Sequence, residues 1–107
     1  MENQEEKKER VLLAGVHTGR IDFLEETTEE TMRELEELAK TAGAEVAACV
    51  IQNKPTLDAA TYMGEGKLEE IRMAIPELSV DCVIFDDELS PVQIRNITDF
   101  LGVKVLD

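Results

Sequence analysis

The chain is 107 residues long, is 43% hydrophobic, and carries 24 acidic against 11 basic residues, for a net charge of -13. This length suits one domain with a single core, and no apolar run approaches the roughly 18 residues that a membrane-spanning helix needs. The acidic balance opposes the broad phosphate neutralisation of non-specific DNA or RNA binding, so an RNA contact requires a local patch.

A polar lead precedes the first hydrophobic element. Residues 1–10 have no apolar periodicity, which predicts a disordered lead, and they are charged where a secretory signal would be apolar, which favours a cytoplasmic protein. The folded domain is predicted to run from residue 11 to residue 107. It begins with the continuous apolar run 11–16, which is typical of a strand buried on both faces.

The next segment predicts a helix and then a second strand. Thr27 and Glu30 have the Thr-x-x-Glu spacing of a capping box at a helix start. The apolar residues that follow at helical intervals are Met32, Leu35, Leu38, Ala39 and Ala42. Gly43 supplies a left-handed stop, and the apolar stretch 45–51 predicts a second buried strand.

A long loop and a second helix come next. Residues 52–66 form a loop of a length that is commonly functional or mobile in compact domains. The helix is predicted to begin near Gly66, with an apolar face marked by Leu68, Ile71, Ile75 and Leu78. Because proline has no N–H and crowds the preceding turn, Pro76 is predicted to end or kink this helix at about Ile75.

The last third of the chain predicts a strand, a helix and a strand. Residues 81–85 form the third strand. Ser90, Pro91 and Gln93 combine an N-cap serine, a first-turn proline and a reciprocal glutamine, which marks a helix start. The helix face carries Ile94, Ile97, Phe100 and Leu101. Gly102 ends this helix, and residues 103–106 form the fourth strand.

Strands that alternate with helices predict an α/β fold. The order βαβαβαβ implies a small four-stranded parallel sheet with three right-handed crossover helices, which is a Rossmann-like arrangement. We expect the strand order 2-1-3-4. Cys49 and Cys82 both lie in apolar runs, which predicts buried thiols in a reducing compartment. One histidine and no Cys-x-x-Cys spacing argue against a thiolate or imidazole metal site, so no metal is expected.

The loops that carry polar and glycine residues are predicted to share one edge of the sheet. In open parallel sheets, ligands meet the loops at the carboxyl ends of the strands. Three loops, 17–20, 52–67 and 86–91, must therefore lie side by side, and we call this edge the rim. The rim is predicted to hold His17, Asn53, Lys54, Tyr62, Gly64, Gly66, Lys67, Asp86 and Asp87.

The Gly64-Glu65-Gly66-Lys67 turn does not form a known phosphate motif. A P-loop requires Gly-x-x-x-x-Gly-Lys followed by Ser or Thr, but here Thr61 takes the first glycine position and Leu68 follows the lysine. The Rossmann Gly-x-Gly-x-x-Gly after the first strand is also missing. Two readings stay open: a weak anion site made by N–H groups at a helix start, or glycines that serve the turn alone.

The acidic cluster after the third strand is equally ambiguous. Asp86, Asp87 and Glu88 could hold magnesium, but they also stand before a helix start, where negative charge favours the helix dipole. A phospho-accepting receiver is disfavoured because the first strand ends in His17 and Thr18 and there is no fifth strand. Gln93, Arg95 and Asn96 could be a solvated helix flank.

Five stretches resemble the N-terminal domain of HflX-type GTPases. They are LLAGV, TAGAEV, ATYMGEGKLEEI, VIFDDELSPVQIRN and LGVKVLD, and the resemblance covers residues 10–107. In that family a helical segment and a GTPase domain with its own P-loop follow, and GTP and magnesium would bind there. This chain ends at Val-Leu-Asp, so the resemblance implies a non-catalytic domain that does not hydrolyse GTP.

The resemblance also implies partners and residue roles. The family acts on the ribosome, and its N-terminal region is implicated in binding rRNA of the large subunit and in separating the subunits; some members bind ATP. Contacts to ribosomal RNA or a nucleotide are expected from Asn53, Lys54, Tyr62, Gly64, Gly66, Lys67, Gln93, Arg95 and Asn96. Loop ordering or contact with the GTPase domain is expected from Asp86, Asp87, Glu88, Ser90 and Pro91.

Two alternatives remain at this stage. The domain could be a small nucleotide-binding module that takes ATP at the Gly66 helix start, with magnesium on the acids 86–88. It could instead be a regulatory domain that docks on its GTPase partner and contacts neither RNA nor nucleotide. No catalytic residue is assigned in either case.

Overall fold

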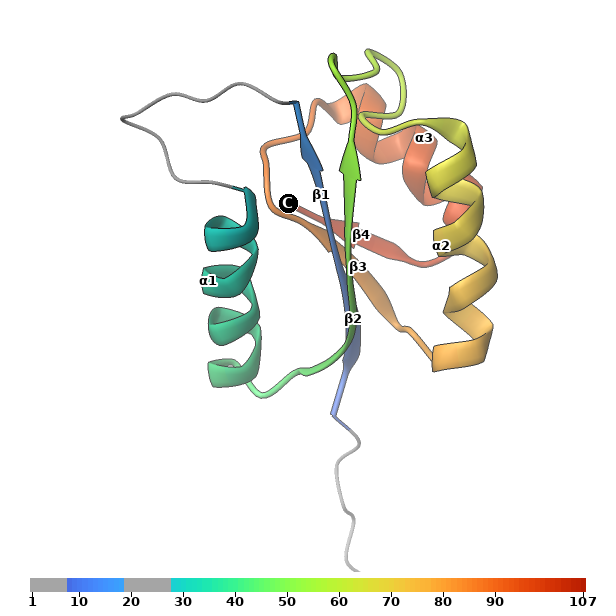
Figure 1. Ribbon diagram of the computed structural model, residues 1–107. Coiled ribbons are helices and arrows are strands. Elements are labelled where there is room, and N and C mark those ends of the chain that lie inside the picture. The colour runs from blue at the N-terminus through green and yellow to red at the C-terminus, as the bar shows by residue number, and fades with distance from the viewer. Residues whose placement is uncertain (1–7, 19–27) are drawn as a thin grey trace, which may run out of the picture.

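A computed structural model describes residues 8–18 and 28–107 of the chain (Figure 1). The elements are β1 (Arg10–His17), α1 (Thr28–Thr41), β2 (Glu45–Asn53), α2 (Glu65–Leu78), β3 (Cys82–Phe85), α3 (Pro91–Leu101) and β4 (Lys104–Leu106). The four strands form one parallel sheet in the order β2-β1-β3-β4. The predicted α/β class, the three crossover helices and the strand order are confirmed.

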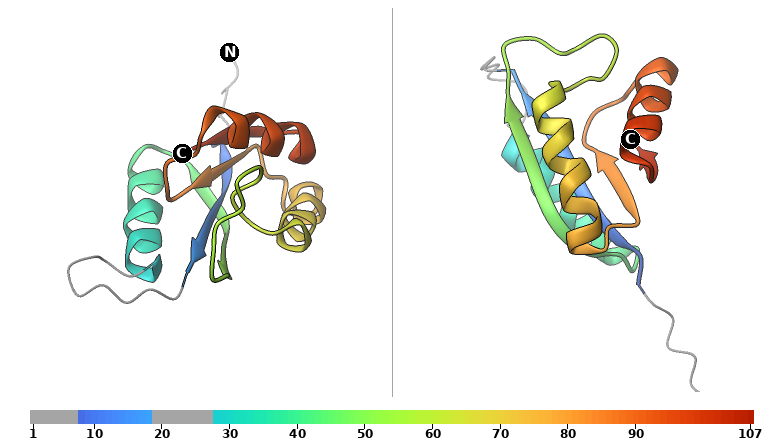
Figure 2. Two further views of the ribbon diagram at one scale, coloured as in Figure 1. Left: turned by 90° about the horizontal axis from the view of Figure 1, so that it is seen from above. Right: turned by 90° about the vertical axis from the view of Figure 1, so that its right-hand side faces the viewer.

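The sheet separates two hydrophobic clusters. α1 lies on one face, and α2 and α3 lie on the other (Figures 1 and 2). The residues of β1 alternate between the faces: Leu12 and Ala14 pack toward α2 and α3, whereas Val11 and Leu13 pack toward α1. Because both faces are covered, β1 is buried from Val11 to Val16, which explains its unbroken apolar sequence.

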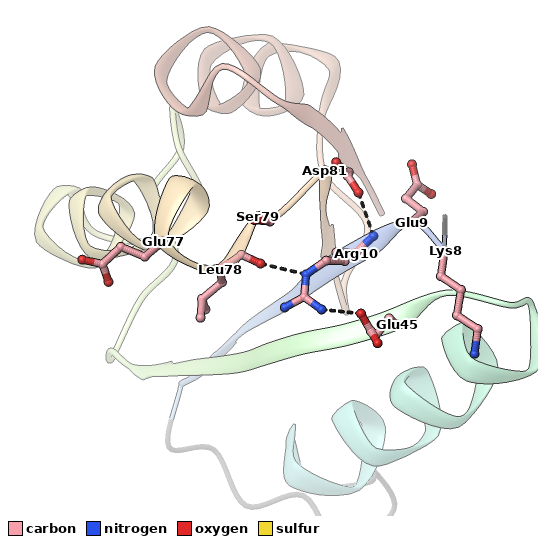
Figure 3. Close-up of a pocket in the computed structure, with 8 residues that line it drawn as sticks. All are labelled: Lys8, Glu9, Arg10, Glu45, Glu77, Leu78, Ser79 and Asp81. Carbon is pink, nitrogen blue, oxygen red and sulfur yellow. Dashed lines mark hydrogen bonds and ion pairs between the residues drawn. The ribbon is translucent and has the colours of Figure 1, made fainter. Parts of the chain in front are cut away.

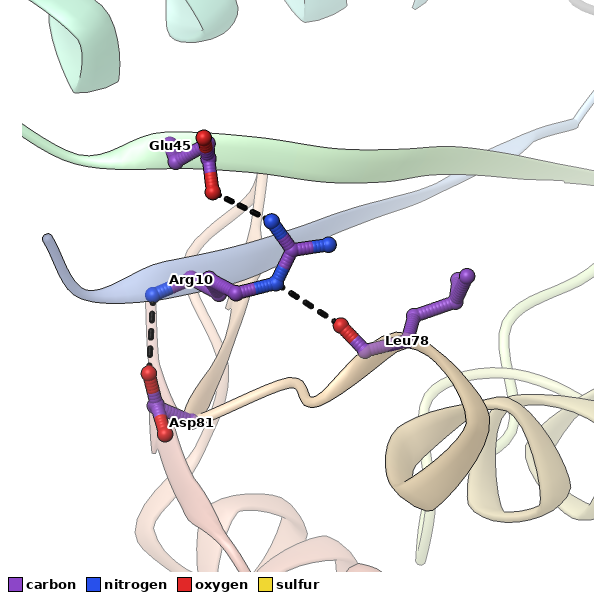
Figure 4. Close-up of polar contacts among 4 residues, drawn as sticks. All are labelled: Arg10, Glu45, Leu78 and Asp81. Carbon is purple, nitrogen blue, oxygen red and sulfur yellow. Dashed lines mark hydrogen bonds and ion pairs between the residues drawn. The ribbon is translucent and has the colours of Figure 1, made fainter.

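The start of the domain differs from the predicted boundary. Arg10, assigned to the lead, is the first residue of β1. Its guanidinium contacts the Leu78 carbonyl oxygen and the Glu45 carboxylate, and its backbone N–H donates to Asp81 (Figures 3 and 4). These bonds tie the beginnings of β1 and β2 to the end of α2. Residues 1–7 of the predicted lead lie outside the described residues.

The helix α1 confirms part of its predicted apolar face. Met32 and Ala39 are buried against the sheet, but Leu38 is 67% exposed and Ala42 is also exposed. A single helix covers this face, so only the narrow stripe that touches β1 and β2 is shielded. Thr27 of the predicted capping box lies outside the described residues, and α1 begins at Thr28.

Pro76 was predicted to end or kink α2 at about Ile75, and the predicted end is wrong, because α2 continues through Pro76 to Leu78. The proline stands in the last turn, and both Pro76 and Arg72 are exposed, so water can satisfy the Arg72 carbonyl that a proline leaves unpaired. The helix ends at Ser79, whose φ of 55° is left-handed. The N–H of Val80 then donates to the Ile75 carbonyl over 2.9 Å, which closes a Schellman-type turn.

The strand β2 is longer and more exposed than predicted. It extends two residues beyond Ile51, to Asn53, so the connecting loop is shorter than expected. Cys82 is buried as predicted, but the prediction of a buried Cys49 is wrong. β2 is an edge strand with no neighbour on its outer side, so Glu45, Cys49 and Asn53 stay exposed along it.

Candidate functional site

The rim predicted from the sequence lies at one edge of the sheet. His17 and Asn53 are the last residues of β1 and β2, and Asp86 directly follows β3. All strands are parallel, so these ends meet at the edge that is uppermost in Figure 1. The Lys54 N–H donates to the His17 carbonyl over 3.0 Å, and the Asp86 N–H donates to the Ala14 carbonyl over 3.0 Å. The remaining part of the predicted 17–20 loop lies outside the described residues.

The loop between β2 and α2 is held in one conformation by hydrogen bonds within it. The carboxylate of Asp58 accepts hydrogen bonds from the N–H groups of Thr61 and Ala60 at 2.9 and 2.8 Å, and these bonds lower the pKa of Asp58. Asp58 and Tyr62 also exchange two backbone hydrogen bonds. The loop is therefore closed on itself by its own backbone and one side chain.

Tyr62 anchors this loop in the core. It adopts a left-handed φ of 69° and is 2% exposed. Its ring packs edge-on against Phe85 at 5.5 Å between centroids, and its hydroxyl donates to Asp87 over 3.3 Å. Burial, followed by the charges of Asp87 and Asp86, raises the pKa of Tyr62 above its usual range. A buried tyrosine ring offers no stacking surface to a ligand, so its place at the rim is that of an anchor.

Two side-chain amides of α3 also hold the loop between β2 and α2 in place. The side-chain NH2 of Gln93 donates to the Asp58 carbonyl over 2.9 Å, and that of Asn96 donates to the Ala60 carbonyl over 3.0 Å. Gln93 also completes the predicted capping box, because its side-chain oxygen accepts from the Ser90 N–H. Sequence reasoning found the cap but not the bonds to the loop, since the partners are 35 and 36 residues away.

The glycine turn forms the start of α2, one residue earlier than predicted. Gly64 is the N-cap, and its N–H donates to the Gln52 side chain over 2.8 Å. No side chain caps this helix, so the N–H groups of its first turn face outward. A Cβ at Gly64 would meet the Gln52 amide at 3.0 Å, whereas a Cβ at Gly66 would meet nothing within 4 Å. The fold therefore does not require glycine at 66.

Lys67 follows in the first turn of α2 and points along the side of the helix. Its ammonium is 3.3 Å from Glu70, and its side chain is 28% exposed. Lys54, in contrast, lies directly at the rim. Together with His17, Thr18, Asn53 and Pro55 it lines a hollow of about 430 Å³, and none of these described lining residues is acidic. On a chain with a net charge of -13, this is a local surface that tolerates an anion.

The acids after β3 point in different directions. Asp86 accepts from the Thr31 hydroxyl at 3.2 Å on the α1 side, whereas Asp87 meets Tyr62 on the side of α2 and α3. Burial, and to a lesser degree the neighbouring Asp87 charge, raises the pKa of Asp86, while the Thr31 bond lowers it. One carboxylate oxygen of Asp86 is buried without a partner. In the described part of the chain no three His, Cys, Asp or Glu side chains converge on a metal position.

The remaining predicted residues flank α3. Ser90 is its N-cap and Pro91 its first residue, and both are exposed. Glu88 and Arg95 are also exposed, and the Glu88 N–H donates to the Asp87 carboxylate over 2.8 Å. The structure thus brings together two loops of the rim and the first turns of α2 and α3.

A larger hollow lies at the opposite edge of the sheet. It measures about 970 Å³ and surrounds Arg10, with Lys8, Glu9, Glu45, Glu77 and Asp81 around it (Figure 3). The guanidinium of Arg10 at the centre of this hollow already pairs with Glu45 and with the Leu78 carbonyl at the end of α2. The polar groups of the hollow therefore serve to join the beginnings of the strands. The rim is therefore the better candidate despite its smaller volume. No helix within residues 8–18 and 28–107 is both long and apolar enough to cross a membrane.

Comparison with known proteins places this geometry in a family. A family model described as GTP-binding GTPase N-terminal matches residues 29–107. GTPase HflX of Caldanaerobacter subterraneus subsp. tengcongensis is 44% identical over 107 residues, which cover all of this chain and 24% of that protein. GTPase HflX of Lacrimispora saccharolytica is 47% identical over 102 residues, 95% of this chain and 23% of the relative.

More distant relatives match the same region. GTPase HflX of Escherichia coli is 31% identical over 87 residues, which cover 81% of this chain and 20% of that protein. The chain thus spans about a quarter of the length of the relatives it matches. With a fold, a motif set and a family model that agree, the chain belongs to the GTP-binding GTPase N-terminal family, as an N-terminal domain of the HflX type.

Proposed function

We propose that this domain is the non-catalytic, ribosome-binding module of an HflX-type GTPase and that its rim contacts rRNA of the large ribosomal subunit, in support of subunit separation. The observation that carries the proposal is that two of the five HflX-like stretches, ATYMGEGKLEEI and VIFDDELSPVQIRN, meet at one edge of the sheet. The loop 54–64, the start of α2 and the start of α3 are joined there by the bonds of Gln52, Gln93 and Asn96. A rigid edge of this kind pays little ordering entropy on binding.

The Lys54 hollow is the part of the rim whose chemistry best suits a phosphate backbone. The ammonium of Lys54 favours an anion, and none of the described residues that line its hollow is acidic. The N–H groups at the start of α2 also favour an anion, but they lie beside a second hollow whose lining includes Glu65 and Glu69. Asp86 and Asp87 instead bond Thr31 and Tyr62, which supports a role in ordering the loops. Gln93 and Asn96 support the site in the same way, through the backbone of the loop.

Catalysis is not assigned to this chain. The P-loop pattern is missing from the 107 residues, so GTP and magnesium are expected in the GTPase domain of the longer relatives. ATP at the α2 start, the second candidate, has the free N–H groups in its favour. The donors for its magnesium do not fit, since Asp86 and Asp87 point to opposite faces of the sheet.

Sedimentation of the domain with purified large subunits tests the proposal. Binding should be present at low salt and fall steeply as salt rises, because released counterions drive phosphate contacts. Lys54→Ala should weaken it, whereas Lys104→Ala, at the opposite edge, should not. Absence of binding at low salt, or equal loss in both variants, would count against the rim. Saturation by ATP that Lys54→Ala leaves intact would favour the nucleotide reading.

A further inference from the structure

The outer edge of β2 is the longest unpaired backbone edge in the described part of the chain. β2 has nine residues and pairs with β1 alone. In Figure 1 it is the strand nearest the viewer, with α1 on one side and α2 on the other. From Val46 to Asn53 it has no charged residue and no proline, the devices that usually protect an edge, although a register shift lies between Val46 and Ala48.

A hollow runs beside this edge, between β2 and α2. It measures about 400 Å³, and its lining is mostly apolar, with Ala48, Val50, Ile71 and Ala74 among the residues, while the ion pair of Lys67 and Glu70 also borders it. Ala48, Val50 and Ala74 are only partly buried, so the hollow reaches the hydrophobic core from outside. A strand added to β2 would direct alternate side chains into it, and this combination of an edge and a pocket gives both affinity and selectivity in strand addition.

The charge of the molecule indicates the kind of strand. The net charge of -13 attracts a basic segment and repels a second copy of this chain. Two cations beside the middle of the strand are already paired, Lys40 with Glu36 at 3.0 Å and Lys67 with Glu70 at 3.3 Å. Among the described residues, the ammonium of Lys54 lies beyond the rim end of β2, so an incoming basic strand would meet unpaired positive charge at that end.

We propose that the β2 edge binds an extended, basic segment of a partner protein by strand addition, with apolar side chains of that segment in the hollow under α2. This surface shares only Asn53 with the lining of the Lys54 hollow, and it does not depend on the proposed contact with RNA. It predicts that backbone N–H groups of the ligand, and not its charge alone, determine binding.

A fluorescent nine-residue peptide that alternates lysine with valine is the probe, measured by anisotropy with the 107-residue chain. The matched control is the same peptide N-methylated at alternate residues, which keeps the charge but removes backbone donors. We expect the control to bind about tenfold more weakly or worse, because several hydrogen bonds are lost. Amide chemical shifts should change along β2.

Variants separate this surface from the rim. Cys49→Lys should weaken binding of the peptide at least about threefold by charge repulsion, whereas Cys49→Ser should not, and both are expected to fold because Cys49 is exposed. Lys54→Ala, which removes a positive charge beside the rim end of β2, should not weaken peptide binding. The proposal is overturned by equal binding of the N-methylated peptide, by shift changes confined to the rim, by no binding at about 1 mM peptide, or by pairing of the chain with itself.

Discussion

At the scale of single residues, the two glycines at the start of α2 differ in what they do. Gly64 lies against the Gln52 amide, and its missing Cβ leaves room for the bond between them. Gly66 faces open space and has no left-handed φ. Since the fold does not need Gly66, we propose that this glycine lets a partner approach the backbone closely.

Exchange of each glycine for alanine tests this difference. Gly66→Ala should raise the free energy of unfolding by up to about 1 kcal/mol, because alanine favours the helix and restricts the unfolded chain. It should nevertheless weaken binding to large ribosomal subunits. Gly64→Ala should lower the free energy of unfolding through the contact with Gln52. Urea unfolding measures both values, and a destabilised Gly66→Ala would show that the residue serves the turn.

The pH dependence of the free energy of unfolding tests the raised pKa of Asp86. Its carboxyl pKa is raised by burial, so the unfolded chain, with a pKa of about 4, loses this proton more easily than the folded one. Asp86 therefore lowers the free energy of unfolding progressively as pH rises from about 4 through its folded pKa. Asp86→Asn removes this effect and keeps an acceptor for Thr31. Its melting temperature relative to the parent should rise between pH 4 and pH 7.5, and a pH-independent difference would contradict the assignment.

At the scale of elements, the sequence predicted what local chemistry decides. The Ser90, Pro91 and Gln93 signature located the start of α3, and the alternation of apolar runs with helical periods gave every strand and helix. The predicted end of α2 at about Ile75 was wrong because the effect of a proline in the last turn depends on whether the carbonyl it leaves unpaired is exposed to solvent. Cys49 misled because an apolar run does not tell an edge strand from a central one.

The candidate site was predictable in position but not in construction. Parallel topology alone brings His17, Asn53 and Asp86 to one edge. The bonds from Gln93 and Asn96 to the loop could not be predicted, since they join residues that only the folded sheet brings together. The same holds for Tyr62, whose sequence neighbours give no sign of its burial or its bond to Asp87.

Removal of these amides should loosen the loop. Gln93→Ala should lower the free energy of unfolding by about 1 to 2 kcal/mol, because the variant loses the reciprocal cap and the bond to the Asp58 carbonyl. Asn96→Ala should lower it by about 1 kcal/mol, because one hydrogen bond is lost. Amide hydrogen exchange in residues 58–63 should accelerate in both. Arg95→Ala, on the exposed side of the same helix, is the matched control. Unchanged exchange in the loop would mean that Tyr62 and the bonds of Asp58 hold it without the two amides.

At the scale of the whole molecule, the distribution of charge determines which surface suits RNA and which suits a protein segment. The excess of acidic residues opposes RNA binding over most of the surface, so the proposed ribosome contact would be confined to the rim. The part of the β2 edge without charged residues, from Val46 to Asn53, is the surface proposed for a protein segment. The chain spans about a quarter of the length of the HflX relatives that match it over its whole length. In the proposed function this domain recognises the ribosome, and hydrolysis is assigned to the GTPase domain of those relatives.

Lysine acetylation in the presence of large ribosomal subunits tests the central claim most directly, since one sample reports on both edges of the sheet. Lys54 at the rim should lose reactivity on binding, and Lys67 to a smaller extent because Glu70 already holds it. Lys8 and Lys104, at the opposite edge, should react as in the free domain. Protection of Lys104 with an unchanged Lys54 would contradict the account.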